Sequence, residues 1–396
     1  MKKLAIYFIA FVLMISSVSF ATEESSENNS SDISENETVS IYAKAEVVKV
    51  GEIKEVETGS VKDTVQEVTI EILDGEFETE EFTTNYVLSY DMEGKIQAYE
   101  LEVGDKVNVQ ITEDEAGNTA VTIHDLVRSN YIILMFGLFL LSILLVGGKQ
   151  GLKAIIGLII TILAIYFILI KGIYTGHNSI LMTILSSTII ISLTFIVIGG
   201  FSKKILTAAI GTLGGIISSG IIATIFSHLA KLSGACEDAI QLSMNIGTMN
   251  FNFRELIFAG IVISALGACM DVGMSIASSL DEIKNKTKDI SWKELFKSGM
   301  NIGKDVIGTM TNTLILAYVG GALTLILLFL ACNMGFDEIL NKETIAEEVI
   351  SAISGSMGVV FTVPITAIVY AILNRKKTIY KVTSENKVEG QRSLKI

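Results

Sequence analysis

Residues 256–278 read LIFAGIVISALGACMDVGMSIAS and decide the fold class of this chain. The run is apolar along nearly its whole length, and a helix made from it is long enough to cross the hydrocarbon core of a bilayer. Its one charged side chain is Asp271, and an ionised carboxylate at that depth is costly in free energy. The chain is therefore expected to be a membrane protein in which Asp271 faces protein or water.

Six further apolar runs of similar length predict an all-α membrane bundle of seven transmembrane helices within residues 129–374. The predicted spans are residues 131–146, 152–170, 180–198, 206–226, 256–278, 314–332 and 349–373. Half of the residues are hydrophobic and the mean hydropathy is +0.55, which excludes a soluble cytosolic enzyme.

Basic residues are distributed unevenly between the loops on the two sides of this bundle. One side holds Lys149, Lys203, six lysines within residues 281–304 and the basic tail 375–396. The loops of the other side hold only Lys171, Lys231, Arg254 and Lys342. The positive-inside rule therefore predicts a cell-membrane protein with a cytoplasmic C-terminus and with residues 22–128 outside.

The first 40 residues predict an export signal followed by a tether. Lys2 and Lys3 precede an apolar run at residues 4–15, and small residues lead to Ala21, so residues 1–21 are interpreted as a signal peptide cleaved after Ala21. A retained signal anchor is the alternative. Residues 22–40 carry six acidic and no basic side chains, which predicts an acidic disordered linker.

Residues 41–128 change to the alternating pattern of β-strands and predict a small extracytoplasmic β-barrel of the OB type. The strands are expected at residues 45–50, 66–73, 82–88, 107–112 and 119–123, separated by turns that contain glycine. Residues 22–130 hold 27 acidic and 7 basic side chains, which argues against nucleic-acid binding. A spacer, a partner-docking domain or a cation-collecting domain remain as interpretations.

Small and polar residues share one stripe of the 256–278 helix, and two interpretations of that stripe stay open. One is a helix-packing face, with Asp271 hydrogen-bonded across it; the other is a proton or cation site in a pathway. The stripe consists of Gly260, Ser264, Gly267, Asp271, Ser275 and Ser278. Gly211 and Gly215, on the 206–226 helix, form a small-xxx-small pair for which packing is the default.

A second polar cluster, at residues 298–313, follows a predicted capping box of Ser291 and Glu294. Asp305 and Asn312 are seven residues apart, which places them on one side of a continuous helix. Gly308 is expected to break that helix at membrane depth and to act as a hinge, as transporter helices are broken at ion sites. The alternative is a cytoplasmic helix entrance with solvated side chains. Pro364, in the last span, predicts a structural kink or a gate hinge.

Three motifs carry a resemblance to a known family: GACMDVGMSIASS at residues 267–279, NIGKD at 301–305 and GTMTNTLILAYVG at 308–320. With these motifs the chain resembles the YibE/F family of bacterial multi-pass membrane proteins over about residues 41–373. The resemblance implies a permease-like membrane protein with no established substrate. Lys304 stands where the family pattern has Arg. The motif positions are Asp271, Ser275, Ser278, Asn301, Asp305, Gly308, Asn312, Thr313, Tyr318 and Pro364.

The residues do not support an enzyme, a metal centre or a cofactor. Gly303-Lys-Asp305 and Ala352-Ile-Ser-Gly355 each lack the first glycine of an intramembrane protease motif, and no phosphate-binding glycine loop precedes a helix. The three histidines lack metal-ligand spacing. Cys236 and Cys332 are the two cysteines that are expected on the outer side, where a disulfide is one option.

Transport of a small solute or ion by a secondary mechanism is the leading expectation. Its pathway would consist of Asp271, Ser275, Asn301, Asp305, Asn312 and Thr313. The alternative is a non-transporting envelope anchor or signalling protein whose barrel, residues 41–128, docks a partner or a second copy of the chain. The partners expected in either case are the lipid bilayer and, for transport, a small solute or cation.

Overall fold

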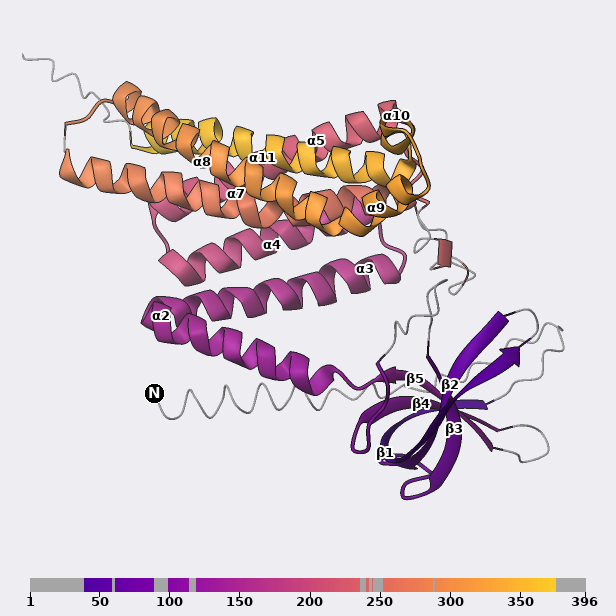
Figure 1. Cartoon of the computed structure of the whole chain (residues 1–396). Coiled ribbons are helices and arrows are strands. Elements are labelled where there is room, and N and C mark those ends of the chain that lie inside the picture. Colours follow the sequence, from indigo (N-terminus) through magenta and orange to yellow (C-terminus); the bar gives the residue numbers. More distant parts are fainter. Residues whose placement is uncertain are drawn as a thin grey trace, which may run out of the picture. The chain divides into compact units, whose positions relative to one another are not determined.

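The computed structural model describes residues 39–58, 61–88, 99–113, 119–235, 240–241, 244, 252–287 and 289–374 (Figure 1). The chain divides into two compact units, Met1–Leu134 and Met135–Ile396. The predicted signal peptide, nearly all of the predicted linker, Cys236 and the C-terminal tail lie outside the described residues.

The N-terminal unit contains a five-stranded antiparallel sheet in the order β3-β2-β1-β4-β5. Strands form where the alternating pattern predicts them, and β1 is long enough to pair with β4 along its first half and with β2 along its second. The strands are β1 (Val39–Thr58), β2 (Val61–Ile72), β3 (Glu81–Leu88), β4 (Lys106–Glu113) and β5 (Thr119–Leu126).

The sheet is curled into a half-barrel. Pairing between β1 and β2 shifts register between Val47 and Lys49 and again between Val50 and Ile53, and such irregularities bend a strand and increase its twist. The two edge strands approach each other, because the Thr84 hydroxyl on β3 donates a hydrogen bond of 2.6 Å to a β5 carbonyl. Alternate side chains fill the inside of the curl, among them the fully buried Ala45, Ile70, Val107 and Val109.

Gln66 is the one buried side-chain amide among the described residues of this core, and it holds the loop before β4. Its Nε2 donates to the Leu101 carbonyl at 3.0 Å and its Oε1 accepts from the Leu101 N–H at 2.8 Å. Gln66→Ala is expected to speed hydrogen exchange at the Leu101 amide about hundredfold, because two buried backbone groups lose their partner at a cost of roughly 3 kcal/mol. Gln110→Ala, which removes a hydrogen bond between the Gln110 and His124 side chains on the surface, is the control. Equal exchange rates in both variants would show that Gln66 does not hold the loop.

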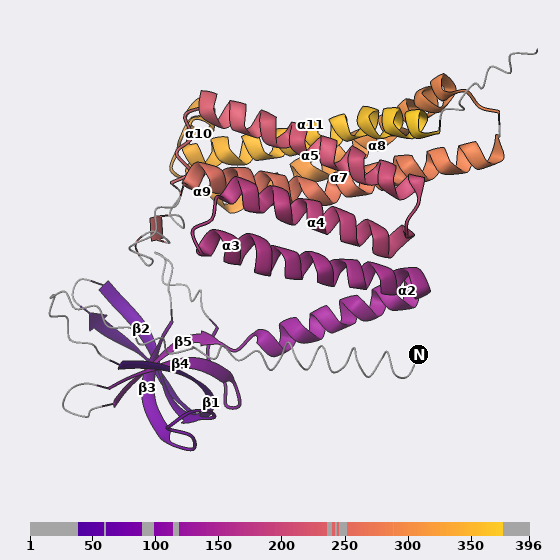
Figure 2. The same cartoon turned by 180° about the vertical axis from the view of Figure 1, so that it is seen from behind.

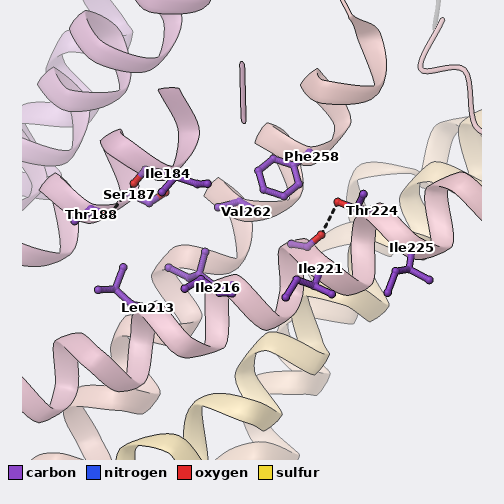
Figure 3. Close-up of a pocket in the computed structure, with 12 residues that line it drawn as sticks. Ile184, Ser187, Thr188, Leu213, Ile216, Ile221, Thr224, Ile225, Phe258 and Val262 are labelled. Carbon is purple, nitrogen blue, oxygen red and sulfur yellow. Dashed lines mark hydrogen bonds between the residues drawn. The ribbon is translucent and has the colours of Figure 1, made fainter. Parts of the chain in front are cut away.

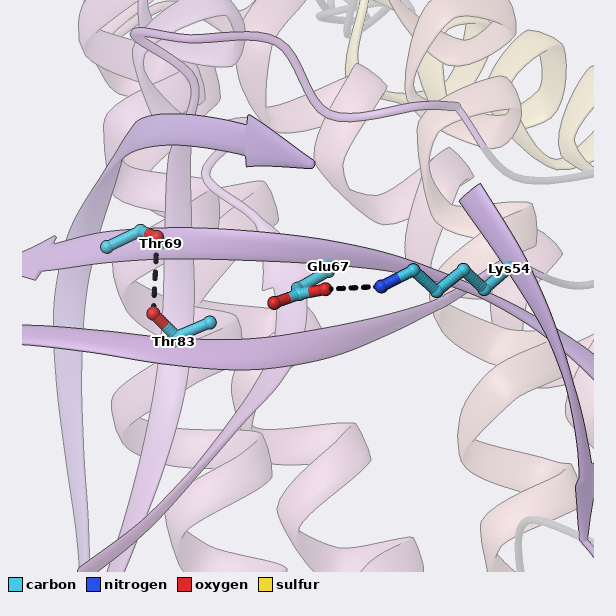
Figure 4. Close-up of polar contacts among 4 residues, drawn as sticks. All are labelled: Lys54, Glu67, Thr69 and Thr83. Atoms are coloured by element: carbon cyan, nitrogen blue, oxygen red, sulfur yellow. Dashed lines mark hydrogen bonds and ion pairs between the residues drawn. The ribbon is translucent and has the colours of Figure 1, made fainter. Parts of the chain in front are cut away.

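The outer surface of the sheet carries two cross-strand contacts, shown in Figure 4. Lys54 pairs with Glu67 at 2.9 Å, and the Thr69 and Thr83 hydroxyls lie 3.2 Å apart. The hydrogen bond and the attraction between the two charges raise the pKa of Lys54 and lower the pKa of Glu67. Water screens this exposed pair, so it contributes little to stability.

The C-terminal unit is helical, and short polar segments separate its long apolar helices. Its helices are α2 (Ser129–Ala164, which begins at the end of the first unit), η1 (Ile165–Ile170), α3 (Lys171–Tyr174), α4 (Ser179–Gly199), α5 (Lys203–Leu229), α7 (Phe253–Lys286), α8 (Trp292–Gly321), α9 (Leu323–Ala331), α10 (Phe336–Leu340) and α11 (Glu343–Leu373). Side chains cap three of them: Asn178 caps α4, Ser202 caps α5, and the predicted capping box of Ser291 and Glu294 is confirmed at α8.

Within the described residues, five helices are long and apolar enough to cross a membrane, or up to six if α8 and α9 form one bent span. The predicted number of seven transmembrane helices is therefore not confirmed. Residues 129–174, where two of them were predicted, form a single helical stretch. That stretch contains a break at Gly148 (φ 53°, ψ −125°), a backbone conformation that essentially only glycine adopts. Figure 1 shows α2 turning back on itself there.

Helices α5, α7, α8 and α11 form the core of the helical unit, and both views show them side by side (Figures 1 and 2). Glycines permit the closest approaches between them. A Cβ added at Gly211 would overlap the Thr366 hydroxyl on α11, and one at Gly215 would overlap Thr362 and lie 2.7 Å from the Gly358 carbonyl. A Cβ at Gly303 on α8 would overlap Val363, so α11 is enclosed by α5 and α8.

The helix break expected at Gly308 is absent, because α8 is continuous from Trp292 to Gly321. The backbone hydrogen-bond ladder of a helix does not require a side chain, so a single interior glycine is tolerated at a modest cost in free energy. The bend of 52° instead follows Gly321, after two consecutive glycines. Residues 298–313 are thus part of one long helix that extends well beyond the predicted 314–332 span.

Candidate functional site

The polar stripe of α7 points away from the core of its own unit. Gly260, Ser264, Gly267, Asp271 and Ser275 are exposed, whereas residues on the opposite side of α7 are buried. Those buried residues include Ile261, Leu266, Val272 and Ile276, which pack against α5 and α11. Nothing among the described residues lies within 4 Å of a Cβ added at Gly260 or Gly267. Both glycines therefore lie in open space, unlike Gly211 and Gly215.

A second polar stripe lies along α8. Asn301, Asp305, Asn312 and Thr313 are exposed, as is Gly308, which also has open space around it among the described residues. The opposite side of α8 carries the buried Leu295, Gly299, Gly303 and Leu314, and both glycines lie against α11. The spacing of the polar residues thus matches a helix that packs on one side and is open on the other.

The two stripes belong to neighbouring antiparallel helices. The Ser264 hydroxyl and the Tyr318 hydroxyl are 2.5 Å apart, which sets the register between α7 and α8. Seven residues along each helix from that contact, about 10 Å at 1.5 Å per residue, Asp271 lies level with Thr311. Asn312 is then within one residue of the level of Asp271, and Asp305 lies about 9 Å further along.

The groups of these stripes differ in how their hydrogen-bonding capacity is used. The Thr313 hydroxyl donates to the Thr309 carbonyl at 2.9 Å, a bond within α8. Four other side chains have no hydrogen-bond or ion-pair partner in the part of the chain that the structure describes: Asp271, Asn301, Asp305 and Asn312. We call these four residues, together with Ser275, the α7–α8 polar face. Their oxygens and amides are available to water, an ion or another chain.

Pro364 lies in the middle of α11, and α11 continues through it. Two threonines near it bond back to the helix: Thr362 donates to the Gly358 carbonyl at 2.9 Å and Thr366 to the Thr362 carbonyl at 2.7 Å. Such bonds within a helix favour a slight bend. Pro364 is therefore not brought to the α7–α8 polar face, and its predicted hinge role is not tested by this geometry.

No metal centre is visible in the described ranges, since no group of three His, Cys, Asp or Glu side chains there could hold an ion. Of the cysteines with a described position, Cys269 is buried and Cys332 is exposed, and both are free thiols. The arrangement of the α7–α8 polar face suits weak binding of a proton or a hydrated cation between carboxylate and amide groups.

A groove and a pocket along the C-terminal half of α5 could not be predicted from the sequence. An apolar groove forms between α4, α5 and α7 (Figure 3). A smaller pocket, lined in part by His228, Arg254 and Glu255, adjoins it. Each helix contributes a few ordinary apolar residues to the groove, so no local pattern marks it. In the sequence, Arg254 is only one of the few basic residues of the outer loops, and no pattern singles out Glu255.

The comparison with known families concerns the helical unit. Residues 135–376 match the family described as YibE/F-like protein, a region that contains the whole α7–α8 polar face. Residues 41–134, to which the resemblance was extended above, lie outside that match. No curated protein and no solved structure matches the chain. Because the family match covers more than half of the chain, this membrane protein belongs to the YibE/F-like family.

Proposed function

We propose that this protein is a permease of the cell membrane that moves a small solute or ion by a secondary mechanism along the α7–α8 polar face. The observation that carries the proposal is two carboxylates and two amides on adjacent helices, none of which has a hydrogen-bond or ion-pair partner among the described residues. Polar groups in a membrane are stable where water or protein covers them. A few water molecules in a pathway along this face would hydrate these polar groups. Together with the carboxylate and amide oxygens, they would form a chain along which a proton or cation can move.

A finer topology supports this proposal. If the reversal at Gly148 ends one span and begins the next, and if α8 with α9 forms one bent span, the bundle has the seven crossings that the apolar runs predict. The basic residues then place the C-terminal tail in the cytoplasm and residues 22–128 outside. The order of the strands and the contact between β3 and β5 agree with an OB-type barrel for residues 41–128.

The proposal is tested by water access to the polar face in the reconstituted full chain. In a background in which Cys236, Cys269 and Cys332 are replaced by alanine, Ser275→Cys is expected to react with a charged, water-soluble thiol reagent, and the reaction is expected to block flux of the transported ion. An apolar environment disfavours the reactive thiolate, so Leu193→Cys, at a position that is about half exposed among apolar residues of α4, is expected to stay unlabelled.

The measurements are labelling by mass spectrometry and flux of protons, monovalent cations, divalent cations and amino acids into proteoliposomes. Equal labelling at Ser275 and Leu193, or absence of flux over the whole panel, would contradict the proposal. The chemistry that is proposed needs no catalytic residue and no cofactor.

A second candidate function is a non-transporting envelope protein whose N-terminal sheet docks a partner. One observation favours it: the family match begins at residue 135, so the N-terminal unit is a separate compact unit outside the matched membrane region. Deleting residues 22–128 separates the two functions. A transporter is expected to retain flux without these residues, whereas a docking protein loses its partner and its phenotype.

A further inference from the structure

An apolar groove of about 490 Å³ opens between α4, α5 and α7 (Figure 3). Its wall on α5 runs from Leu213 to Ile225, a length of roughly 18 Å along the helix axis. Ile184 on α4 and Phe258 on α7 form the other walls. Gly220 lets the Phe258 ring lie close against α5, since a Cβ at Gly220 would lie 2.7 Å from that ring. The groove is thus long, narrow and almost entirely hydrocarbon.

A smaller pocket of about 130 Å³, which several polar and charged side chains help to line, adjoins one end of this groove and shares Thr224 and Phe258 with it. Its other lining includes His228, Arg254 and Glu255, at the C-terminal end of α5 and the N-terminal end of α7. The ends of apolar helices lie where the headgroups of a bilayer are found. Groove and pocket therefore combine a hydrocarbon slot with a polar terminus at headgroup depth.

Arg254 supplies the cation of the pocket and interacts electrostatically with the Glu343 carboxylate. Its Nε donates to the Leu232 carbonyl at 2.9 Å, which holds the side chain in place, and no described residue pairs with its terminal nitrogens. The Glu255 carboxylate already accepts bonds from the Asn178 amide, the Ser179 N–H and the Asn252 amide, at 3.0 to 3.2 Å. The nearby Glu343 carboxylate accepts from Ser233 and Gly234.

The pocket therefore offers an anion the planar fork of Arg254, with His228 beside it. An arginine fork matches the geometry of a phosphate group and can donate two parallel hydrogen bonds to it.

We propose that groove and pocket together bind one phospholipid, with an acyl chain along α5 and the phosphate on Arg254 and His228. Both halves of the site are needed for this assignment. Free phosphate would leave the groove without an occupant, and a hydrocarbon without a headgroup would leave the terminal nitrogens of Arg254 without a hydrogen-bond partner among the described residues. The site lies on α4, α5 and α7 away from the α7–α8 polar face, so it does not depend on the transport proposal.

The test is native mass spectrometry of the full chain in detergent with added palmitoyl-oleoyl-phosphatidylglycerol. The comparison ligands are the diacylglycerol with the same acyl chains, which lacks only the phosphate headgroup, and inorganic phosphate. Wild type is expected to retain one phosphatidylglycerol per chain. Arg254→Gln is expected to lower that affinity about tenfold, because a charged hydrogen-bond donor is lost, and to leave diacylglycerol binding unchanged.

A second variant tests the groove. Ile221→Trp places a larger side chain in the slot and is expected to lower the affinity for both phosphatidylglycerol and diacylglycerol. Two matched controls are Lys231→Gln, which removes the same charge outside the pocket, and Ile210→Trp, which enlarges an exposed α5 residue outside the groove. Both are expected to bind as wild type, and thermal melting verifies that all four variants are folded. Unchanged phosphatidylglycerol binding in Arg254→Gln, or in Ile221→Trp, would overturn the proposal, and so would phosphate binding as tight as that of the lipid.

Discussion

Asp271→Asn is expected to abolish transport while the protein stays folded. The amide has nearly the same shape as the carboxylate, so packing is preserved, but it cannot carry a proton or balance a cation. Loss of a charged interaction of roughly 3 kcal/mol corresponds to about a hundredfold fall in occupancy of the site, and flux is expected to fall to a similar extent. Flux into proteoliposomes made from wild type and variant measures this directly.

Asp337→Asn is the matched control, because it makes the same change in the short helix α10, away from the α7–α8 polar face. It is expected to leave both flux and melting temperature unchanged. If Asp271→Asn retains wild-type flux, Asp271 is not part of a pathway. If instead the variant melts at a lower temperature and changes the oligomeric state, Asp271 is a packing carboxylate at an interface between copies.

Gly215→Ala is expected to destabilise the helical unit by about 3 kcal/mol, near the upper end of what overpacking costs. The added methyl group would overlap the Thr362 hydroxyl and would lie 2.7 Å from the Gly358 carbonyl oxygen. The hydroxyl can rotate away, but the carbonyl belongs to the backbone of α11 and moves only if the two helices separate. Unfolding of the purified protein by a denaturing detergent, followed by circular dichroism, measures the loss.

Gly267→Ala is the control for stability, since it makes the same substitution in a helix of the same bundle. A Cβ at Gly267 has no described atom within 4 Å, and alanine favours a helix over glycine by roughly 0.5–1 kcal/mol. This variant is expected to be as stable as wild type or slightly more stable. Equal destabilisation by both substitutions would mean that Gly267 is covered, as it would be by a second copy of the chain.

Local patterns in the sequence predicted much of the fold. Alternation of apolar and polar residues placed the five strands, because a half-buried strand needs a period of two. The capping box of Ser291 and Glu294 was predictable because its partners are three residues apart. The apolar runs also predicted membrane helices. Hydropathy alone did not settle their number, because the reversal at Gly148 lies inside one helical stretch.

At the candidate site, the sequence predicted which polar residues share one side of a helix, but it did not predict which residues of other helices lie next to them. The sequence placed Asp271 and Ser275 on one stripe and Asp305 and Asn312 on another. Only the packing of α7 against α8, with its contact between the Ser264 and Tyr318 hydroxyls, sets the two stripes side by side. The break expected at Gly308 failed because a helix held on one side by α11 remains continuous through a single glycine.

The sequence by itself determined the membrane class, the family and the acidic sheet domain, because composition, hydropathy and short-range periodicity depend only on nearby residues. Only the tertiary structure decided which glycines are structural. Gly211 with Gly215 and Gly260 with Gly267 are similar small-residue patterns, yet the first pair presses on α11 and the second faces open space. Likewise, only the tertiary structure shows the apolar groove between α4, α5 and α7, because its walls come from three helices. A residue's neighbours across a bundle are set by how distant helices pack, and no local pattern records that.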